Sequence, residues 1–328
     1  MKKIPYIWIV LGLIAILAGC SPIRKMKTDV LEPAEMVFPD EVFTVGYVVP
    51  SPLMQVNTRT GSPQPNVDAT QQFWTGLMDV AVNSPRFNPR SLKLLDTSGV
   101  TTSSDTLSRA QVRHISDSLG LDAVALVHPF ILSDSLEREI MYDYGSASFY
   151  FIYQVQAKIH WKLYHPGKQK IVNQSQYDEE FVWESVGATE RDAIHRLIGL
   201  NRAFRLSAYW AGYDMGQIMF PFWEEQTRTY YARGSRNFRE ARDYVEQNQW
   251  QKAIDLWKKS FTRPNKELAR RAAYNIGFAL EMMGKIDQAI RWINRAQEIQ
   301  YHKKAAEYLE ILRERQEKLQ QLDRQMPI

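Results

Sequence analysis

The chain has almost no cysteine: Cys20 is the single one among 328 residues. One cysteine excludes a disulfide within the chain and any metal site that is built from several thiolates. Long hydrophobic runs are also missing after the first 18 residues, although a membrane-spanning helix needs about 20 apolar residues in a row. These two absences exclude a small disulfide scaffold and a protein with several membrane spans.

The sequence also lacks the short motifs that mark common enzyme classes. It contains no G-x-S-x-G elbow, no P-loop and no G-x-G-x-x-G turn, and its 6 histidines form no H-E-x-x-H pair. We therefore expect no catalytic residues, no metal ion and no cofactor. The net charge is small as well, +4 for the whole chain and +2 once Lys2 and Lys3 are left out. Such a balance argues against nucleic acid as a partner.

A short apolar run at the start is the most specific feature that the sequence does have. Basic residues precede the run over residues 6–18, and small residues then lead into a cysteine, as in a secretory signal. The four residues around the expected cleavage site resemble the lipobox of bacterial lipoproteins: Leu17, Ala18, Gly19 and Cys20. The resemblance implies that residues 1–19 are removed and that Cys20 receives fatty acyl chains such as palmitate, which hold the protein at a membrane. The alternative is an ordinary signal peptide in which the cysteine is incidental.

Residues 20–40 are predicted to form a lipidated tether, and residues 41–187 a mixed α/β domain. Strand and helix patterns alternate along residues 41–129, which indicates a sheet with helices packed on it. The clearest pattern covers residues 149–163, where the odd positions are apolar and most even positions are polar. A Pro-Gly turn follows, and residues 170–183 return as a partner strand. We therefore expect a long antiparallel hairpin with one partly wet face.

Helical patterns dominate the rest of the chain. Residues 188–235 are rich in aromatic side chains and are predicted to form connecting helices, the last of which caps the segment that follows. Residues 236–328 contain a repeated motif, because the pattern at residues 250–254 recurs at residues 286–290, an offset of 36 residues. The small residues at fixed positions resemble those of tetratricopeptide repeats, which pair two helices with a period of about 34 residues. A charged helix expected over residues 301–325 would cover the open end of the stack.

These patterns predict an α+β fold class, a mixed sheet domain followed by an all-α, tetratricopeptide-like solenoid. In repeats of this kind the stacked helix pairs form a concave surface that suits peptides or partner domains. The candidate groove residues are Tyr244, Asn248, Asn275, Phe278 and Met282. The alternative is that these helices only stabilise the end of the chain.

The layout as a whole resembles an uncharacterised family of bacterial envelope lipoproteins that end in tetratricopeptide repeats. Short segments carry this resemblance, at residues 32–35, 84–87 and 221–223. We interpret the protein as a membrane-anchored, non-catalytic binding or scaffolding component of an envelope complex, with membrane lipid and envelope proteins as its partners. Ser21 follows the cysteine in place of aspartate, which favours the outer membrane.

Two other functions stay open at this point. An envelope enzyme that acts on glycan or peptidoglycan would use a polar group on the hairpin face, formed by His160, Asp178 and Glu180. A carrier of small molecules or lipids would use the aromatic segment 210–231 to line a cavity. A solvated strand and a packed core are the plainer interpretations of these two features.

Overall fold

A computed structural model gives the fold, and it describes residues 22–49, 54–57, 64–65, 67–86, 92–96, 106–128, 130–143, 146–167 and 170–326. The signal segment and the lipobox lie outside these residues. None of the helices within these ranges is both long and apolar enough to cross a membrane. The chain divides into two compact units. Of the described residues, the helical unit holds residues 22–30 and Glu224–Gln321, and the sheet unit holds those of Leu31–Trp223 and residues 322–326.

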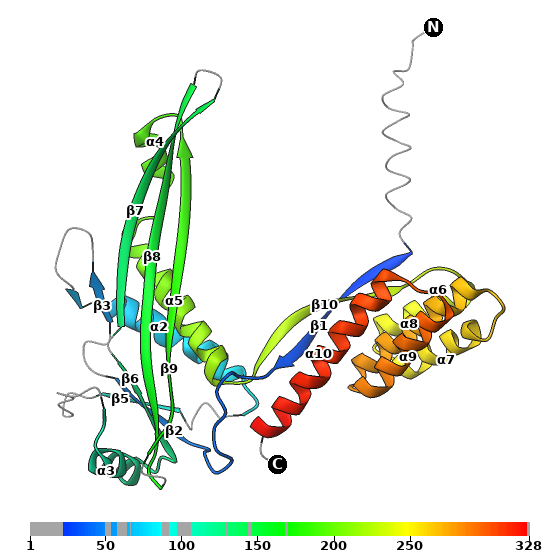
Figure 1. Ribbon diagram of the computed structural model, residues 1–328, viewed down its shortest axis with the longest axis horizontal. Coiled ribbons are helices and arrows are strands. Elements are labelled where there is room, and N and C mark those ends of the chain that lie inside the picture. The colour runs from blue at the N-terminus through cyan, green and yellow to red at the C-terminus, as the bar shows by residue number, and fades with distance from the viewer. Residues whose placement is uncertain are drawn as a thin grey trace. The chain divides into compact units, whose positions relative to one another are not determined.

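The sheet unit contains a mixed sheet, as the alternating patterns predict (Figure 1). Its strands are β2 (Val45–Val49), β3 (Met54–Asn57), β4 (Gln64–Pro65), β5 (Leu92–Asp96), β6 (Ala123–Val127), β7 (Phe130–Asp143), β8 (Ser146–His165) and β9 (Lys170–Gly187). Their order in the described part of the chain is β4-β3-β7-β8-β6-β2-β5, and β9 also pairs with β8. β2 is parallel to β5 and β6, whereas β8 is antiparallel to β6, β7 and β9.

The long antiparallel hairpin consists of β8 and β9, and the alternation of residues sets its two faces. Val155 and Ile159 belong to the odd-numbered set, and neither has any exposed surface. Gln156, Lys158 and His160 point to the opposite face and are exposed. Burial of the odd positions removes a continuous apolar stripe from water, which stabilises the sheet. The predicted hairpin with one dry and one wet face is therefore confirmed.

Two helices, α2 (Val67–Asn83) and α5 (Leu200–Met219), pack against each other and share the core of the sheet unit with β8. Glycine brings them close: a Cβ added at Gly212 would lie 1.9 Å from the carbonyl oxygen of Phe73. Gly76 makes the same kind of approach from α2, with a carbonyl oxygen of α5 at 2.0 Å from its added Cβ. No larger residue fits at either position unless a helix backbone moves, so these glycines fix the helix separation.

Local sequence sets the limits of the shorter helices. α3 (Arg109–Leu119) starts with a reciprocal capping box between Ser108 and Gln111. It ends at Gly120, which has a left-handed φ of 63°. α4 (Glu190–Arg196) starts after a threonine whose hydroxyl accepts a main-chain hydrogen bond. In both helices a polar side chain just before the first turn binds the main chain of that turn.

The helical unit contains consecutive helices, and each of the first four packs against its neighbour along the chain. Its helices are α6 (Arg236–Glu246), α7 (Trp250–Phe261), α8 (Lys266–Met282), α9 (Ile286–Ile299) and most of α10 (Lys303–Gln325). A Cβ added at Gly277 of α8 would lie 2.6 Å from the Cδ1 atom of Ile293 on α9. Ala273 and Ala289 are fully buried nearby in sequence. Small residues therefore allow the two helices to cross closely, while their identity as tetratricopeptide repeats stays a prediction.

Two strands that the patterns did not indicate complete the helical unit. β1 (Ile23–Glu32) lies within the expected tether, and β10 (Phe222–Tyr231) stands where an aromatic helix was expected before Arg236. The expectation of that helix was wrong. The two strands pair with each other, and the carbonyl oxygen of Pro22 accepts a hydrogen bond from the N–H of Ala232 at 2.8 Å. The start of β1 thus meets the end of β10, so the strands run antiparallel.

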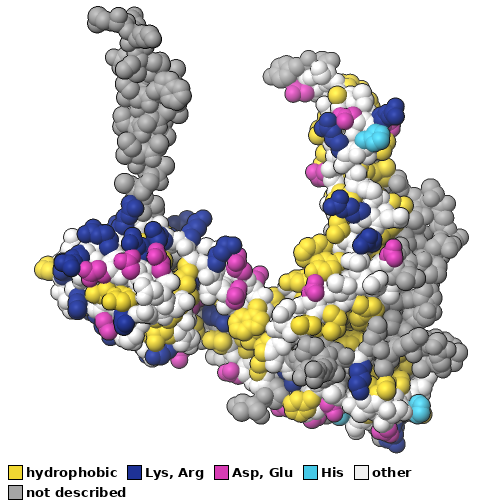
Figure 2. Space-filling model, turned by 180° about the vertical axis from the view of Figure 1, so that it is seen from behind, with side chains coloured by type: hydrophobic (Ala, Val, Ile, Leu, Met, Phe, Trp, Pro, Cys, Tyr) yellow, Lys and Arg dark blue, Asp and Glu magenta, His cyan; other side chains and the backbone are white. Residues whose placement is uncertain are grey.

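Charge is divided unequally between the two units. From residue 22 on, the helical unit has 23 Lys and Arg side chains against 15 Asp and Glu, a formal charge of +8. The sheet unit has 16 against 22, a formal charge of −6. Figure 2 shows Lys and Arg side chains gathered along one edge of the helical unit. The nearly neutral total therefore hides two units of opposite sign.

Candidate functional site

The groove predicted on the helical unit is the first candidate site, and strand β10 lies on part of it. Asn275 and Phe278 stand on α8, and neither has any exposed surface. Asn275 binds Tyr231 and Phe278 stacks on Tyr230, the last two residues of β10. Two of the five candidate groove residues are therefore covered by another segment of the same unit.

Asn275 holds the main chain of β10 with its side-chain amide. Its Oδ1 atom accepts a hydrogen bond from the N–H of Tyr231 at 2.8 Å, and its Nδ2 atom donates one to the carbonyl oxygen of Tyr231 at 2.7 Å. These are the two main-chain groups that a neighbouring strand would otherwise satisfy. The amide therefore replaces one residue of a strand, and it recognises an extended main chain rather than a particular side chain.

Aromatic contacts anchor the side chains on either side of this clamp. Tyr230 stacks on Phe278 with ring centroids 5.2 Å apart, and Trp250 meets the same ring edge-on at 5.9 Å. Tyr231 packs edge-on against Tyr274 at 5.3 Å. Such pairs contribute about 0.5–1.5 kcal/mol each beyond the area that they bury. Both tyrosines of β10 are therefore anchors and not merely neighbours of the helices.

A buried ion pair forms a third attachment between β10 and the helices. The Nε atom of Arg228 lies 2.9 and 3.2 Å from the two carboxylate oxygens of Glu281, and the hydroxyl of Tyr308 on α10 also donates to this carboxylate. None of the three residues is more than 7% exposed. Burial raises the pKa of Tyr308 well above its ordinary value, and Glu281 raises it further, so the hydroxyl stays protonated. The cluster joins β10, α8 and α10, and the loss of either charged partner would leave the other charge buried without compensation.

The other three candidate groove residues keep some exposed surface. Tyr244 is half-buried, and the Nζ atom of Lys252 lies 5.5 Å from its ring centre. Asn248 is exposed and has a φ of 55°, a left-handed conformation that asparagine adopts more readily than most residues. Met282 at the end of α8 is half-buried against the core. The five residues thus do not form one open groove, and these three are the part that a partner can reach.

The polar group considered for catalysis lies on the wet face of the β8–β9 hairpin. His160, Asp178 and Glu180 are all exposed. Asp178 forms an ion pair with Lys158 at 3.4 Å and accepts a hydrogen bond from Gln156 at 3.1 Å. Exposed carboxylates beside a lysine are typical of a solvated strand whose charges discourage pairing with other strands. The arrangement favours a surface role for this group.

One carboxyl group with a raised pKa lies on the other side of the sheet and was missed by sequence reasoning. Asp214 on α5 accepts a hydrogen bond from the hydroxyl of Tyr177 on β9 at 2.7 Å. Burial raises the pKa of Asp214, the hydrogen bond from Tyr177 lowers it, and Glu179 raises it again, with a net upward shift. Alternation along β9 could have placed Tyr177 on the buried face, but its partner on a distant helix has no sequence signal. The bond ties α5 to the sheet.

The aromatic segment considered for a carrier is mostly packed into the protein. Met215, Met219 and Phe220 have no exposed surface, and Phe220 stacks on Phe38 with ring centroids 6.5 Å apart. Trp210 is instead 45% exposed on α5. Side chains that fill an interior leave no room for a ligand there, so this part of the segment serves as core.

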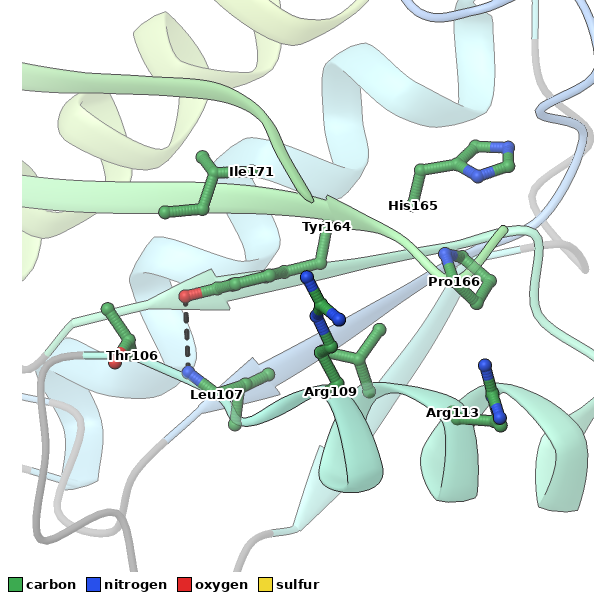
Figure 3. Close-up of a pocket in the computed structure, with 9 residues that line it drawn as sticks. Thr106, Leu107, Arg109, Arg113, Tyr164, His165, Pro166 and Ile171 are labelled. Atoms are coloured by element: carbon green, nitrogen blue, oxygen red, sulfur yellow. Dashed lines mark hydrogen bonds between the residues drawn. The ribbon is translucent and has the colours of Figure 1, made fainter. Parts of the chain in front are cut away.

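A separate pocket of about 160 Å³ lies in the sheet unit between α3 and the end of the β8–β9 hairpin (Figure 3). Arg109 and Arg113 line it from successive turns of α3, and Tyr164 and Ile171 line it from the hairpin. The hydroxyl of Tyr164 accepts a hydrogen bond from the N–H of Leu107 at 3.2 Å. Pockets for drug-sized molecules measure about 300–1,000 Å³. This pocket therefore suits a single side chain or a ligand of similar size.

Two family models match this chain, one over most of the sheet unit and strand β10 and the other within the helices that follow. Residues 71–231 match the family described as Domain of unknown function (DUF8603), and residues 239–314 match the one described as Domain of unknown function (DUF6340). No curated protein matches the chain. Within the described residues, no three His, Cys, Asp or Glu side chains come together in a way that could hold a metal ion. Neither family description names an activity.

The chain is also similar in part to solved bacterial structures. A putative neuraminyllactose-binding hemagglutinin homolog from Helicobacter pylori is 11% identical, with a TM-score of 0.30, over 56% of this chain and 87% of that one. Lipoprotein GNA1162 from Neisseria meningitidis is 11% identical, with a TM-score of 0.22, over 52% and 98%. The PelC dodecamer from Paraburkholderia phytofirmans is 9% identical, with a TM-score of 0.24, over 57% and 96%. Likenesses this low leave the function to be argued from the residues of this chain.

Proposed function

We propose that this protein is a membrane-anchored bacterial lipoprotein that acts as a non-catalytic binding or scaffolding component of an envelope complex. Its anchor is Cys20, which is acylated after residues 1–19 are removed, and its membrane is the outer membrane. Its helical unit consists of two tetratricopeptide-like pairs, α6 with α7 and α8 with α9, and α10 closes the stack.

The position of β1 is the observation that carries this proposal. β1 begins at Ile23, and three residues of extended chain span at most about 11 Å. Ile23 and Met26 pack on the core of the helical unit, and Arg24 forms an ion pair with Glu246 of α6. An acylated Cys20 would therefore hold a folded unit directly beside the bilayer, without the long tether that many anchored domains have. A protein fixed in this way is suited to hold partners at the membrane.

The partner surface that we propose consists of the exposed candidate residues Tyr244, Asn248 and Met282. β10 already occupies the positions that Asn275 and Phe278 would offer, and it is fixed there by the Asn275 clamp. A partner would therefore meet the helices beside the β1–β10 ribbon, because it cannot replace the ribbon without breaking buried contacts.

Site-specific photocrosslinking in the native envelope tests this surface. Tyr244 is replaced by benzoylphenylalanine in the full-length protein, and the same replacement at Tyr301, which is 74% exposed in the same unit, serves as the matched control. We expect a discrete adduct of defined mass from position 244 after irradiation, and none of that mass from position 301. Absence of an adduct at position 244, or the same adducts from both positions, would contradict a partner at this surface.

A further inference from the structure

The basic side chains of the helical unit concentrate near the start of β1. Lys25 of β1 and Lys304 of α10 are close enough to repel each other, and within the described residues Lys25 has no ion-pair partner. The Nζ atom of Lys304 donates a hydrogen bond to the hydroxyl of Thr229 on β10 at 3.2 Å. Two like charges held side by side favour the binding of an anion between or above them.

The surroundings of this pair are also positive. Burial lowers the pKa of His302, which lies just before α10. The positive charges of Arg270, Arg271 and Lys304 lower this pKa further. The one carboxylate among them, Glu267, is already shared by Arg270 and Arg271 at 2.6 to 2.7 Å. Burial lowers the pKa of Lys304, Glu307 raises it, and Lys25 lowers it again, with a net downward shift. Arg271 and Lys303 are paired with Glu267 and Glu307. The basic edge, defined here as Lys25 and Lys304, therefore consists of the two lysines that form no ion pair within the described residues.

The basic edge lies at the end of the unit where the anchored chain enters. Lys25 follows Cys20 by five residues, and Figure 2 shows the Lys and Arg side chains of this unit gathered on one edge. Arg24 and Lys27, its neighbours on β1, are each paired with a glutamate, Arg24 with Glu246 and Lys27 with Glu225. Of the three basic residues on β1, Lys25 is thus the one that is free to meet an external anion.

We propose that the basic edge binds the anionic phospholipid headgroups of the bilayer in which Cys20 is anchored. This inference rests on the proposed function, because the anchor is what brings the edge to the membrane. Clustered basic residues next to a lipid anchor supply a second, electrostatic attachment that fixes the orientation of the unit on the surface. Headgroup phosphates complement the edge, whereas the sheet unit of the same chain carries the opposite sign and is not attracted to such a surface.

Lysine footprinting of the mature lipoprotein in nanodiscs tests the proposal. The protein is placed in discs that contain phosphatidylglycerol and in discs of phosphatidylcholine alone, and a water-soluble acylating reagent modifies its exposed lysines. Mass spectrometry then reads each lysine separately. We expect Lys25 and Lys27 to react at least about fivefold more slowly in the anionic discs, and the difference to disappear at high salt. Lys258 and Lys259, exposed on α7 across the unit from β1, are internal controls and should react equally in both discs (Figure 1).

A charge-neutral variant and a matched control complete the test. Lys25→Gln with Lys304→Gln should abolish the protection of Lys27, whereas Lys258→Gln with Lys259→Gln should leave it unchanged. Equal reactivity of Lys27 in both kinds of disc would overturn the proposal. Protection that depends on protein concentration and not on anionic lipid would assign the edge to the acidic sheet unit of a second copy, and it would overturn the proposal as well. Failure of the anchor itself is distinguishable, because an unacylated protein would not enter either disc.

Discussion

Substitution of Asn275 by alanine removes the clamp that holds β10 on the helical unit. Asn275 is fully buried, and Tyr231, whose N–H and carbonyl groups it binds, is 2% exposed. Asn275→Ala therefore leaves two main-chain groups without partners in a place that water reaches poorly. An unsatisfied buried group costs about 1–3 kcal/mol. The two groups together predict that β10 loses about 2–6 kcal/mol of stability against opening.

Hydrogen exchange measured by mass spectrometry checks this value in the full-length protein held in detergent. Peptides that cover residues 222–232 report the opening of β10, and those from α9 report the helical unit as a whole. A loss of about 2–6 kcal/mol corresponds to exchange that is roughly 30- to 20,000-fold faster in β10. Asn294→Ala is the matched control, because Asn294 is half-exposed on α9 and its side chain makes no hydrogen bond within the described residues.

Exchange of β10 within about threefold of the wild-type rate, while the helices stay protected, would contradict this prediction. That result would mean that Asn275 is not what holds the strand. Exchange of β10 that is as fast in the Asn294→Ala variant as in the Asn275→Ala variant would also contradict the prediction. Replacement of the half-exposed Asn294 should change stability by no more than about 0.5 kcal/mol.

Three further predictions concern packing, protonation and the buried ion pair. Gly212→Ala should destabilise the sheet unit in urea unfolding by about 1–3 kcal/mol, whereas Gly199→Ala, with no atom within 4 Å of its added Cβ, should change stability by less than about 0.5 kcal/mol. Burial raises the pKa of Asp122, but hydrogen bonds from the segment before β2 and a nearby histidine lower it more, so its folded pKa lies below the ordinary value. The stabilisation that ionised Asp122 gives the fold is thus present above about pH 4 and is lost as the pH falls toward the folded pKa. Thermal unfolding measured against pH should show that the Asp122→Asn variant lacks this loss of stability in acid. A variant with the same pH dependence as the wild type would contradict the prediction. Arg228→Met should destabilise the helical unit by about 3–5 kcal/mol, and adding Glu281→Leu should restore much of it; a double-mutant cycle with additive losses contradicts the pairing.

Local periodicity was sufficient to predict the elements whose stability comes from a single buried face. β8 is such an element, because one strict alternation assigns Val155 and Ile159 to the core and Lys158 to water. The close crossing of α8 and α9 was predictable in the same way, since Gly277 is too small to keep Ile293 away. In both cases the residues that determine the local packing belong to one strand or to two consecutive helices.

β1 and β10 were not predictable, because their partners are far away in the sequence. β10 contains the polar run Glu224, Glu225 and Gln226, which carries no apolar alternation. It is extended because β1 pairs with it on one side and Asn275 binds its main chain. Four of the candidate groove residues lie on α6 and α8, and Asn248 lies in the turn between α6 and α7. No local signal reveals that β10 lies on two of the five.

The charge separation between the two units was hidden for a similar reason. The total of the chain is close to zero, and the strands that belong with the helices, β1 and β10, lie about 190 residues apart. Residues 224–321 alone carry a formal charge of +6, and residues 22–30, which the fold assigns to the same unit, raise it to +8. The fold thus brings the proposed basic edge and the proposed partner surface together in one unit.

Mass spectrometry of the N-terminal peptide, taken from protein purified out of native membranes, tests the central claim most directly. We expect a peptide that begins at Cys20 and carries the mass of acyl chains on that residue. A peptide that begins at Met1, or one that begins at Cys20 with an unmodified thiol, would contradict the lipid anchor and with it the role proposed for the protein at the membrane.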